Sequence, residues 1–373
     1  MRIDYEKRYQ EFCRLLPAAA EAEGLEIKAY LLTKEEDIHY LSGFRGDSTW
    51  LLAGPGCRIL LTDSRYLEQA RQQAPGWEIR EAGLFSGTAE LAASEGLTPL
   101  GYDPASLNVA AYRRLHEALV NTGVASGQAM AAMACPTGSM RQVKDAAELE
   151  LIARACRIAD QALAEIVPLL KPGVSEKRLA AELEYRMALL GSEEPSFDTI
   201  VASGKRGALP HGLASEKLLE AGDMVTFDFG AVYEGYHSDM TRTFILGEPT
   251  AQQRERYQLV LTAQEAAIAA LAPGRRVREI DKIARDYLKE AGLAAYFGHG
   301  LGHSLGLEIH EEPRFSPLAP DTELVPGMVM TVEPGIYLPG WGGLRIEDTL
   351  FIDEKSYGFF TKFPKTLEDM AII

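Results

Sequence analysis

Four carboxylates and one imidazole in the C-terminal part of the chain have the chemistry of a metal-binding set. The residues are Asp228, Asp239, His303, Glu333 and Glu347. Oxygen-rich coordination with a single nitrogen suits manganese, cobalt, iron or zinc, and ligand type alone does not choose among these ions. If the fold brings all five side chains together, they could hold two divalent ions.

Charge repulsion gives a reason to expect cations among these acids. Carboxylates opposed in a sheet repel by roughly 2–4 kcal/mol per pair at separations of about 4–7 Å and an effective dielectric near 20. Summed over all pairs of four acids, the repulsion would rival the ~5–15 kcal/mol net stability of a whole domain. Either the acids lie apart, or cations lie between them.

The two aspartates flank a predicted β-hairpin. Two strand-like segments with alternating apolar residues are separated by a turn near Glu234-Gly235. Asp228 and Asp239 are equidistant from a point between Tyr233 and Glu234. We therefore expect the two aspartates to be cross-strand neighbours on one face of the hairpin.

The two glutamates flank a second predicted hairpin. Glu333 and Glu347 are equidistant from Gly340, which lies in a loop rich in glycine and proline. We expect these two side chains to face each other as well. Pro334 has no backbone N–H to donate, so the strand should bulge or form an edge just beyond Glu333.

Strand alternation assigns two further residues to the faces that carry the acids. Thr241 lies two residues after Asp239, and Arg345 lies two residues before Glu347. Residues two apart in a strand share a face. We expect Thr241 and Arg345 to support the acidic ligands; for Arg345 the alternative is a plain surface salt bridge.

An internal repeat accounts for the presence of two hairpins. Segments 170–191 and 271–292 each contain a Pro-Gly break, an amphipathic helical pattern and a terminal glycine, and each follows an alanine-rich helical stretch. Downstream, segment 222–230 aligns with segment 327–335. Each half should therefore consist of two helices followed by a carboxylate hairpin, and a pseudo-two-fold axis would close both hairpins around one centre.

The histidine-containing segment 298–314 does not have the pattern of a helical zinc site. His299 and His303 are four residues apart, which on a helix would suggest a zinc pair. Gly300 and Gly302 disfavour a helix there, and the HExxH motif is absent. An extended glycine-rich segment would instead let the backbone approach a crowded metal centre closely.

Residues 138–373 resemble the dinuclear metallopeptidases of the pita-bread fold, which include methionine aminopeptidase, aminopeptidase P and prolidase. The five candidate ligands occur in that family's order and within its flanking motifs, which read here Asp-Phe-Gly-Ala, Ser-Asp-Met-Thr-Arg-Thr, Gly-His-Gly-Leu-Gly-His, Glu-Pro-Gly and Arg-Ile-Glu-Asp. Pro-His-Gly at 210–212 and His-Glu-Glu-Pro-Arg at 310–314 are similar to the aminopeptidase P/prolidase branch.

This resemblance implies a fold, an activity and a cofactor. The expected fold is α+β, with a C-terminal pita-bread domain of duplicated helix-helix-hairpin halves after a smaller α/β domain of the creatinase/prolidase N-terminal type. The implied activity is hydrolysis of the Xaa-Pro bond in dipeptides or at the N-terminus of peptides. The implied cofactor is two divalent metal ions per chain, manganese first, with cobalt, zinc or iron as alternatives.

Roles for the ligands follow from the same resemblance. Asp228 and Glu347 would bridge two ions about 3.5–4 Å apart, while Asp239 would complete one ion and His303 the other. A hydroxide bridging the two ions would attack the carbonyl that precedes proline. Glu333 would both bind metal and act as general base and proton shuttle.

Three further residues are expected at the substrate. By family likeness His211 and His310 flank it, where they would stabilise the tetrahedral oxyanion and orient the proline side. The alternative for either histidine is a hydrogen-bonded place in the core. Arg314 matches a prolidase-like position from which a guanidinium could clamp a substrate carboxylate.

Residues 1–136 form a separate predicted domain, and residues 137–373 the catalytic one. Apolar runs alternate with helical stretches in the first segment, which predicts an α/β layer. No dinucleotide or P-loop fingerprint follows any predicted strand. In the resembling family this domain mediates dimerisation and can restrict access to the active site, so we expect a homodimer. Arg45-Gly46-Asp47 indicates a loop turn rather than an adhesion motif.

The composition is that of an ordinary globular protein with an excess of acids. Of its 373 residues, 46% are hydrophobic and 25% charged, and the net charge of -16 argues against nucleic acid or an anionic membrane surface as partner. No apolar run of 18 residues and no signal peptide are present, so we expect a cytoplasmic protein. The four cysteines lack Cys-x-x-Cys spacing and are expected to be reduced thiols.

Two other function classes share the fold that the resemblance implies. One is a non-catalytic binding protein that has lost ligands, and the other is a metal-free hydrolase like creatinase. All five candidate ligands are intact in this sequence, which favours the metallopeptidase over both alternatives.

Overall fold

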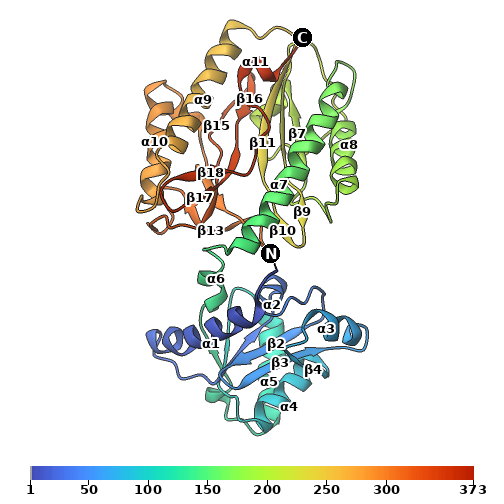
Figure 1. Ribbon diagram of the computed structural model, residues 1–373, viewed down its shortest axis with the longest axis vertical. Helices are drawn as coiled ribbons and strands as arrows, with labels where there is room; N and C mark the ends of the chain where they lie inside the picture. Colours follow the sequence, from blue (N-terminus) through green and yellow to red (C-terminus); the bar gives the residue numbers. More distant parts are fainter. Residues whose placement is uncertain (1) are drawn as a thin grey trace. The chain divides into compact units, whose positions relative to one another are not determined.

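The computed structural model describes residues 2–373, which form two compact units, Arg2–Arg141 and Gln142–Ile373 (Figure 1). Residue 1, with which the predicted N-terminal domain begins, lies outside the described part. The N-terminal unit extends beyond residue 136 because helix α6 (Pro136–Met140) packs against helices α1 (Tyr5–Ala22) and α2 (Glu35–Ser42) of the same unit.

A six-stranded mixed sheet forms the centre of the N-terminal unit, which confirms the predicted α/β layer. Its strand order is β4-β3-β2-β1-β5-β6. The strands are β1 (Ala29–Leu32), β2 (Trp50–Gly54), β3 (Cys57–Thr62), β4 (Glu78–Glu81), β5 (Leu100–Tyr102) and β6 (Met130–Ala132), and the other helices are α3 (Leu67–Gln73), α4 (Leu84–Ser94), α5 (Val109–Asn121) and the 3₁₀ turn η1 (Ser126–Gln128). The sequence did not predict the edge strand β4, because its residues are mostly charged and exposed, as is common at sheet edges.

Two pairs of long helices cover the C-terminal unit. Figure 1 shows one pair on each side of the strands. The first pair is α7 (Ala146–Ile166) and α8 (Glu176–Leu189), and the second is α9 (Ala251–Ala269) and α10 (Val277–Glu290). Helix α7 starts with a capping box, in which Asp145 and Glu148 bond to each other's backbone N–H groups. The duplicated helix pairs confirm the predicted repeat.

The strands of the two halves pack between these helices around one hydrophobic core. Phe227 and Phe244 from the first half and Val332 and Ile346 from the second are all completely buried in it. One sheet, of order β19-β11-β8-β7, joins three strands of the first half to the C-terminal strand β19, and the second half contributes a sheet of order β14-β17-β18. These strands are β7 (Ile200–Ser203), β8 (Met224–Phe229), β11 (Met240–Leu246), β14 (Val329–Val332), β17 (Asp348–Ile352), β18 (Tyr357–Phe359) and β19 (Ala371–Ile372).

Shorter elements connect these sheets and end the chain. Three two-stranded ribbons pair β9 with β10, β12 with β13 and β15 with β16. Their bounds are β9 (Val232–Tyr233), β10 (Tyr236–His237), β12 (Gly302–Ser304), β13 (Glu311–Phe315), β15 (Gly335–Leu338) and β16 (Gly342–Arg345), and the remaining helical turns are η2 (Val167–Leu169), η3 (Gly204–Ala208), η4 (Ala294–Tyr296) and α11 (Leu367–Met370).

The register of the first hairpin differs from the prediction. Asp228 pairs with Thr241 rather than with Asp239, which is therefore a diagonal neighbour on the same face. The turn lies at Glu234 and Gly235 as predicted, and both residues have positive φ, but its centre falls one residue after the midpoint between the two aspartates. The two aspartates still share a face, but they do not oppose each other directly.

The second hairpin has the predicted register. Val332 pairs with Asp348 on one side of Pro334, and Gly335 pairs with Arg345 on the other. Glu333 and Glu347 therefore occupy facing positions between these two ladders. The ladder is interrupted at Pro334, as expected from its missing donor, so the hairpin consists of two consecutive strand pairs.

Two expectations from composition can be compared with the structure. All four cysteines are free thiols, as predicted. Across residues 2–373 we find no helix with both the length and the apolar character that crossing a bilayer would require.

Candidate metal centre

The five predicted ligands line one cavity of about 680 Å³ within the C-terminal unit. Each reaches it from the end of a different strand, because the two hairpins and the β12 strand converge there. Asp228 lies in β8, Asp239 directly before β11, His303 in β12, Glu333 directly after β14, and Glu347 between β16 and β17.

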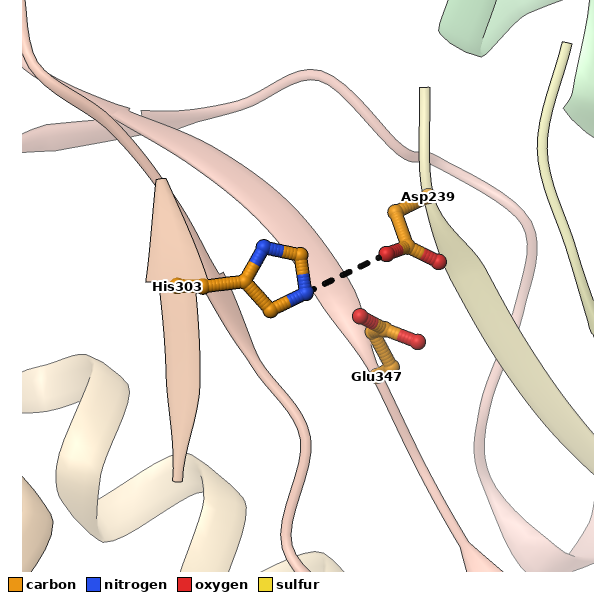
Figure 2. A group of neighbouring side chains, drawn as sticks. All are labelled: Asp239, His303 and Glu347. Atoms are coloured by element: carbon orange, nitrogen blue, oxygen red, sulfur yellow. Dashed lines mark ion pairs between the residues drawn. The ribbon is translucent and has the colours of Figure 1, made fainter. Parts of the chain in front are cut away.

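Three of these side chains form the tightest group. One ligand atom each of Asp239, His303 and Glu347 lies within 4.8 Å of the other two, and Figure 2 shows the three side chains pointing toward one another. The Nε2 atom of His303 is 3.5 Å from Asp239 Oδ2 and also 3.5 Å from Glu333 Oε1. His303 therefore contacts a carboxylate from each hairpin.

Burial makes these acids difficult to ionise without a cation. It raises the pKa of Asp239 to about 6 and that of Glu333 to about 7, and it raises the pKa of Glu347 well above its ordinary value. Burial lowers the pKa of His303, but the hydrogen bond with Asp239 and the charges of Glu333 and Asp239 outweigh it and raise that pKa to about 9. Protons thus supply the positive charge that divalent ions would otherwise bring.

Two carboxylate oxygens of the group have unused bonding capacity. Asp239 Oδ1 and Glu347 Oε1 are buried, and neither has a hydrogen-bond partner among residues 2–373. Buried oxygens of this kind call for an explanation, and an ion is one of the few that apply. The donor set of four carboxylates and one imidazole nitrogen fits divalent transition metals.

Thr241 and Arg345 contact two of the candidate ligands, Glu347 and Asp228, as the strand alternation predicted. Thr241 Oγ1 donates to Glu347 Oε2 at 2.7 Å and accepts from Arg345 Nε at 3.0 Å. Arg345 also forms an ion pair with Asp228 and donates from Nη1 to the hydroxyl of Tyr337 at 2.6 Å. Arg345 is buried with its partners, so it is not the surface salt bridge considered as its alternative.

The predicted substrate-facing residues His211, His310 and Arg314 line the same cavity. The ring of His310 lies 4.5 Å from the ring of His303, centroid to centroid. Burial and the neighbouring His303 charge lower the pKa of His310 to about 4, so it is a neutral imidazole at neutral pH. Arg314 in β13 is half exposed and pairs with Glu312 at 3.2 Å.

His299 is not part of the ligand group. Its Nδ1 atom bonds to the carbonyl of Gly300 at 2.7 Å, and its Nε2 atom to the hydroxyl of Tyr337 at 3.0 Å. Because Gly300 accepts at Nδ1, the proton lies there and Nε2 accepts from Tyr337. The segment around His303 is a strand, so the helical zinc pair with His299 is excluded, as the glycines indicated.

Sequence reasoning missed the side chains that complete the cavity wall. Tyr337 and four apolar residues belong to the lining, and the latter are Phe197, Ile200, Leu213 and Ile309. Tyr337 pairs across the β15–β16 ribbon with Gly343, where the carbonyl of Gly207 lies too close for any side chain. The apolar residues come from three separate loops or strands and have no common sequence pattern.

Comparison with known proteins agrees with this geometry. The model of metallopeptidase family M24 matches residues 150–354, and that of the creatinase/prolidase N-terminal domain matches residues 14–134. The Xaa-Pro dipeptidase of Pyrococcus horikoshii is 37% identical over 351 residues, which cover 91% of this chain and 94% of that protein.

Two solved structures are similar over nearly the full length. The Xaa-Pro dipeptidase from Bacillus anthracis has a TM-score of 0.90 and 41% identity, covering 96% of this chain and 99% of that one. The X-Pro aminopeptidase from Thermotoga maritima has a TM-score of 0.84 and 36% identity, covering 91% and 97%. The chain therefore belongs to metallopeptidase family M24, with a creatinase/prolidase-type N-terminal domain preceding a pita-bread catalytic domain.

Proposed function

We propose that this protein is an Xaa-Pro peptidase that uses two divalent metal ions, manganese in first place, to hydrolyse the bond before proline in dipeptides or at the N-terminus of peptides. The observation that carries the proposal is the convergence of the four acids and His303 in one cavity, with two buried carboxylate oxygens that lack a partner among residues 2–373. The named activities of the similar proteins support the choice of substrate.

The residues that would hold the ions are the two hairpin pairs and one histidine. Asp228, Asp239, His303, Glu333 and Glu347 would together hold the ions. When bound, divalent ions neutralise the acids and lower the pKa of water enough to supply a nucleophile near neutral pH. Arg345 and Thr241 would keep Asp228 and Glu347 oriented through the contacts described above.

Glu333 would move the proton. Its carboxylate lies in the cavity 3.5 Å from His303. A carboxylate at this position could accept a proton from the attacking water and deliver one to the leaving nitrogen. That second delivery is needed here, because the nitrogen of proline leaves as an amine.

His211 and His310 would face the substrate. His310 is neutral at neutral pH because of its lowered pKa, so one ring nitrogen can donate a hydrogen bond to the oxyanion that develops on the carbonyl before proline. Such a donor stabilises the transition state more than the ground state. His211 lines the cavity from the loop after β7 and would contact the substrate on the proline side.

Proline specificity would come from the apolar wall and from Arg314. An Xaa-Pro bond is a tertiary amide without an N–H, so recognition must rely on the ring rather than on that donor. Phe197, Ile200 and Ile309 provide apolar surface in the cavity. The guanidinium of Arg314, which is half exposed, could pair with the carboxylate of a dipeptide.

The experiment that tests this function compares three peptides with one metal-loaded enzyme. Metal-free protein reconstituted with Mn²⁺ should release alanine from Ala-Pro or Ala-Pro-Gly and cleave Ala-Ala at least about tenfold more slowly. The same assays with excess chelator should show no release. Equal cleavage of Ala-Ala, or activity that survives the chelator, would contradict the proposal.

Assembly and location stay predictions. The N-terminal unit is expected to mediate a homodimer and to restrict access to the cavity, and light scattering of the whole chain would test the first point. A mass equal to one chain would contradict it. The expected cytoplasmic location would be tested by fractionation of the cells that produce the protein.

A further inference from the structure

One buried carboxylate, that of Glu176, contacts two distant parts of the loop that carries His211. Glu176 is the first residue of helix α8 and is completely buried. The loop runs between strands β7 and β8, from residue 204 to residue 223. Three residues donate hydrogen bonds to this side chain: Ser203 just before the loop, Arg206 early in it and Ser215 beyond its midpoint.

The contacts saturate the carboxylate. Oε1 accepts from the backbone N–H and the hydroxyl of Ser203 at 2.7 and 2.8 Å. Oε2 accepts from the backbone N–H and the hydroxyl of Ser215 at 3.1 and 2.6 Å, and from Arg206 Nη1 at 2.5 Å. Five donors meet about four lone-pair sites, and all five belong to the loop or to Ser203, the residue directly before it.

The segment between the contact points faces the cavity. Pro210, His211 and Leu213 all line it. Arg206, while paired with Glu176, also donates from Nη2 to the carbonyl of Leu213 at 2.9 Å. The turn at His211 is closed by a bond from the N–H of Gly212 to the carbonyl of Leu209 at 3.0 Å. Both sides of this turn are therefore tied, through Arg206 and Ser215, to one buried anion.

Glu176 is not needed to start its own helix. The N-cap of α8 is Ser175, whose side chain already accepts from the N–H of Arg178 at 3.2 Å. Burying a carboxylate is costly unless it is paired and hydrogen-bonded. The partners of the Glu176 side chain given above are Arg206 and Ser215 of the His211 loop and Ser203 directly before it. The geometry thus connects the position of a cavity histidine to an acid that does not line the cavity.

We propose that Glu176 is the positioning residue of His211: by closing both sides of the loop, it holds the imidazole toward the substrate. The inference rests on the proposed function where it concerns turnover, but its structural part does not. Replacement by glutamine removes the charge and one acceptor and points an amide N–H₂ at existing donors. The loop should then open locally while the metal ligands, which lie on other segments, stay in place.

The first test follows the loop without any activity assay. Hydrogen exchange of the amides in 204–215 should be faster in Glu176→Gln than in the wild type by at least about tenfold, while exchange in β8 and β11 stays unchanged. The matched control is Glu216→Gln, which makes the same chemical change in the same loop at an exposed pair with Lys177. The proposal would be overturned if the amides in 204–215 exchanged at the wild-type rate in E176Q, or if E216Q accelerated their exchange as much as E176Q does.

The second test measures turnover of Ala-Pro with Mn²⁺-loaded enzyme. E176Q should lower kcat/KM by about 10²-fold, the loss expected for a group displaced by about 1 Å, with unchanged metal content. In a His211→Ala background the same change should cost less than about threefold, because a positioning residue has nothing left to position. If the double variant instead loses kcat/KM by the product of the two single losses, Glu176 has a merely structural role and the proposal is contradicted.

A second pair of variants serves if E176Q does not fold. Ser215→Ala removes the hydroxyl bond to Glu176 Oε2 but keeps the backbone donor, and Ser215→Thr restores the hydroxyl. S215A should accelerate exchange near His211 and S215T should reverse it; no difference between them would overturn the proposal. If the wild type cleaves no Xaa-Pro peptide, the proposed function fails, while the exchange experiment still decides whether Glu176 holds the loop.

Discussion

Thr241 of the first hairpin donates a hydrogen bond from Oγ1 to Oε2 of Glu347 in the second, over 2.7 Å. This contact joins the two duplicated halves at the proposed metal centre. The same hydroxyl accepts from Arg345, which also pairs with Asp228. One threonine therefore contributes to the orientation of ligands from both hairpins.

Replacing Thr241 by valine should weaken metal binding without unfolding the protein. Valine has nearly the same shape, but it removes the donor to Glu347 and the acceptor for Arg345. Loss of such a supporting contact typically costs about 10–100-fold in metal affinity. Isothermal titration with Mn²⁺ measures the effect. Thr226→Val is the control, since the hydroxyl of Thr226 shares a hydrogen bond with that of Thr243, which is not a candidate ligand; equal losses in both variants would contradict the assignment.

The stability of the metal-free protein should fall as pH rises through the neutral range. Burial raises the folded-state pKa of Asp239 to about 6 and of Glu333 to about 7, against ordinary values of 3.8 and 4.5. A group with a raised folded-state pKa stabilises the fold fully when the pH is below its ordinary pKa. This contribution is lost as the pH rises through the folded-state pKa. The raised pKa of His303, about 9, has the same sign and extends the loss to higher pH.

Thermal unfolding between pH 4.5 and 8 would measure this loss, to which each group contributes about 1.4 kcal/mol for each pH unit by which its pKa is raised. Metal binding requires the ionised acids, so the gain in Tm on adding Mn²⁺ should increase over the same range. Glu333→Gln should flatten the slope for the metal-free protein, because it removes one of the titrating groups. A metal-free protein that gains stability from pH 5 to 8 would show that these acids do not control its pH dependence.

Glu333→Gln should also abolish turnover. The amide cannot take a proton from the attacking water, and loss of a general base costs about 10²–10⁴-fold. The other four ligands remain, so the variant should still bind metal, although less tightly. Steady-state kinetics and metal analysis of the same sample are required. A kcat within tenfold of the wild type at full metal loading would remove Glu333 from the proton path.

Arg314→Ala should separate dipeptides from longer substrates. If the guanidinium pairs with a dipeptide carboxylate, its removal should raise KM for Ala-Pro by about 10–100-fold, as for the loss of a charge-assisted contact. Ala-Pro-amide carries no carboxylate and provides the matched control, with KM expected to change by less than about threefold. If both substrates lose affinity equally, Arg314 supports the cavity wall rather than the substrate carboxylate.

The sequence predicted most of this site because its periodicity is local. The register of the second hairpin followed from the distances of Glu333 and Glu347 to Gly340, which lies at the centre of the connecting loop. In the first hairpin the turn at Glu234 and Gly235 was predicted, but Asp228 pairs with Thr241 rather than with Asp239, because the two aspartates are not equidistant from that turn. Gly230 adds to this irregularity, since the carbonyl of Ser238 approaches so closely that no side chain would fit.

Contacts between distant segments could not be predicted in the same way. Glu176 reaches Ser215 across 39 positions of sequence, and the buried pair of Lys144 with Glu311 spans 167. No motif connects such residues, because their proximity depends on how helices and loops pack. The apolar lining of the cavity is unpredictable for the same reason, whereas the metal ligands carried strong flanking motifs.

The number of ions bound per chain tests the central claim most directly. Metal-free protein titrated with Mn²⁺ at neutral pH should bind close to two ions per chain, and Glu347→Gln should lower the affinity for both, because Glu347 lies with Asp239 and His303 at the middle of the group. Xaa-Pro hydrolysis should appear only as the ions bind. A chain that binds no ions, and whose activity is the same with and without chelator, would contradict the account.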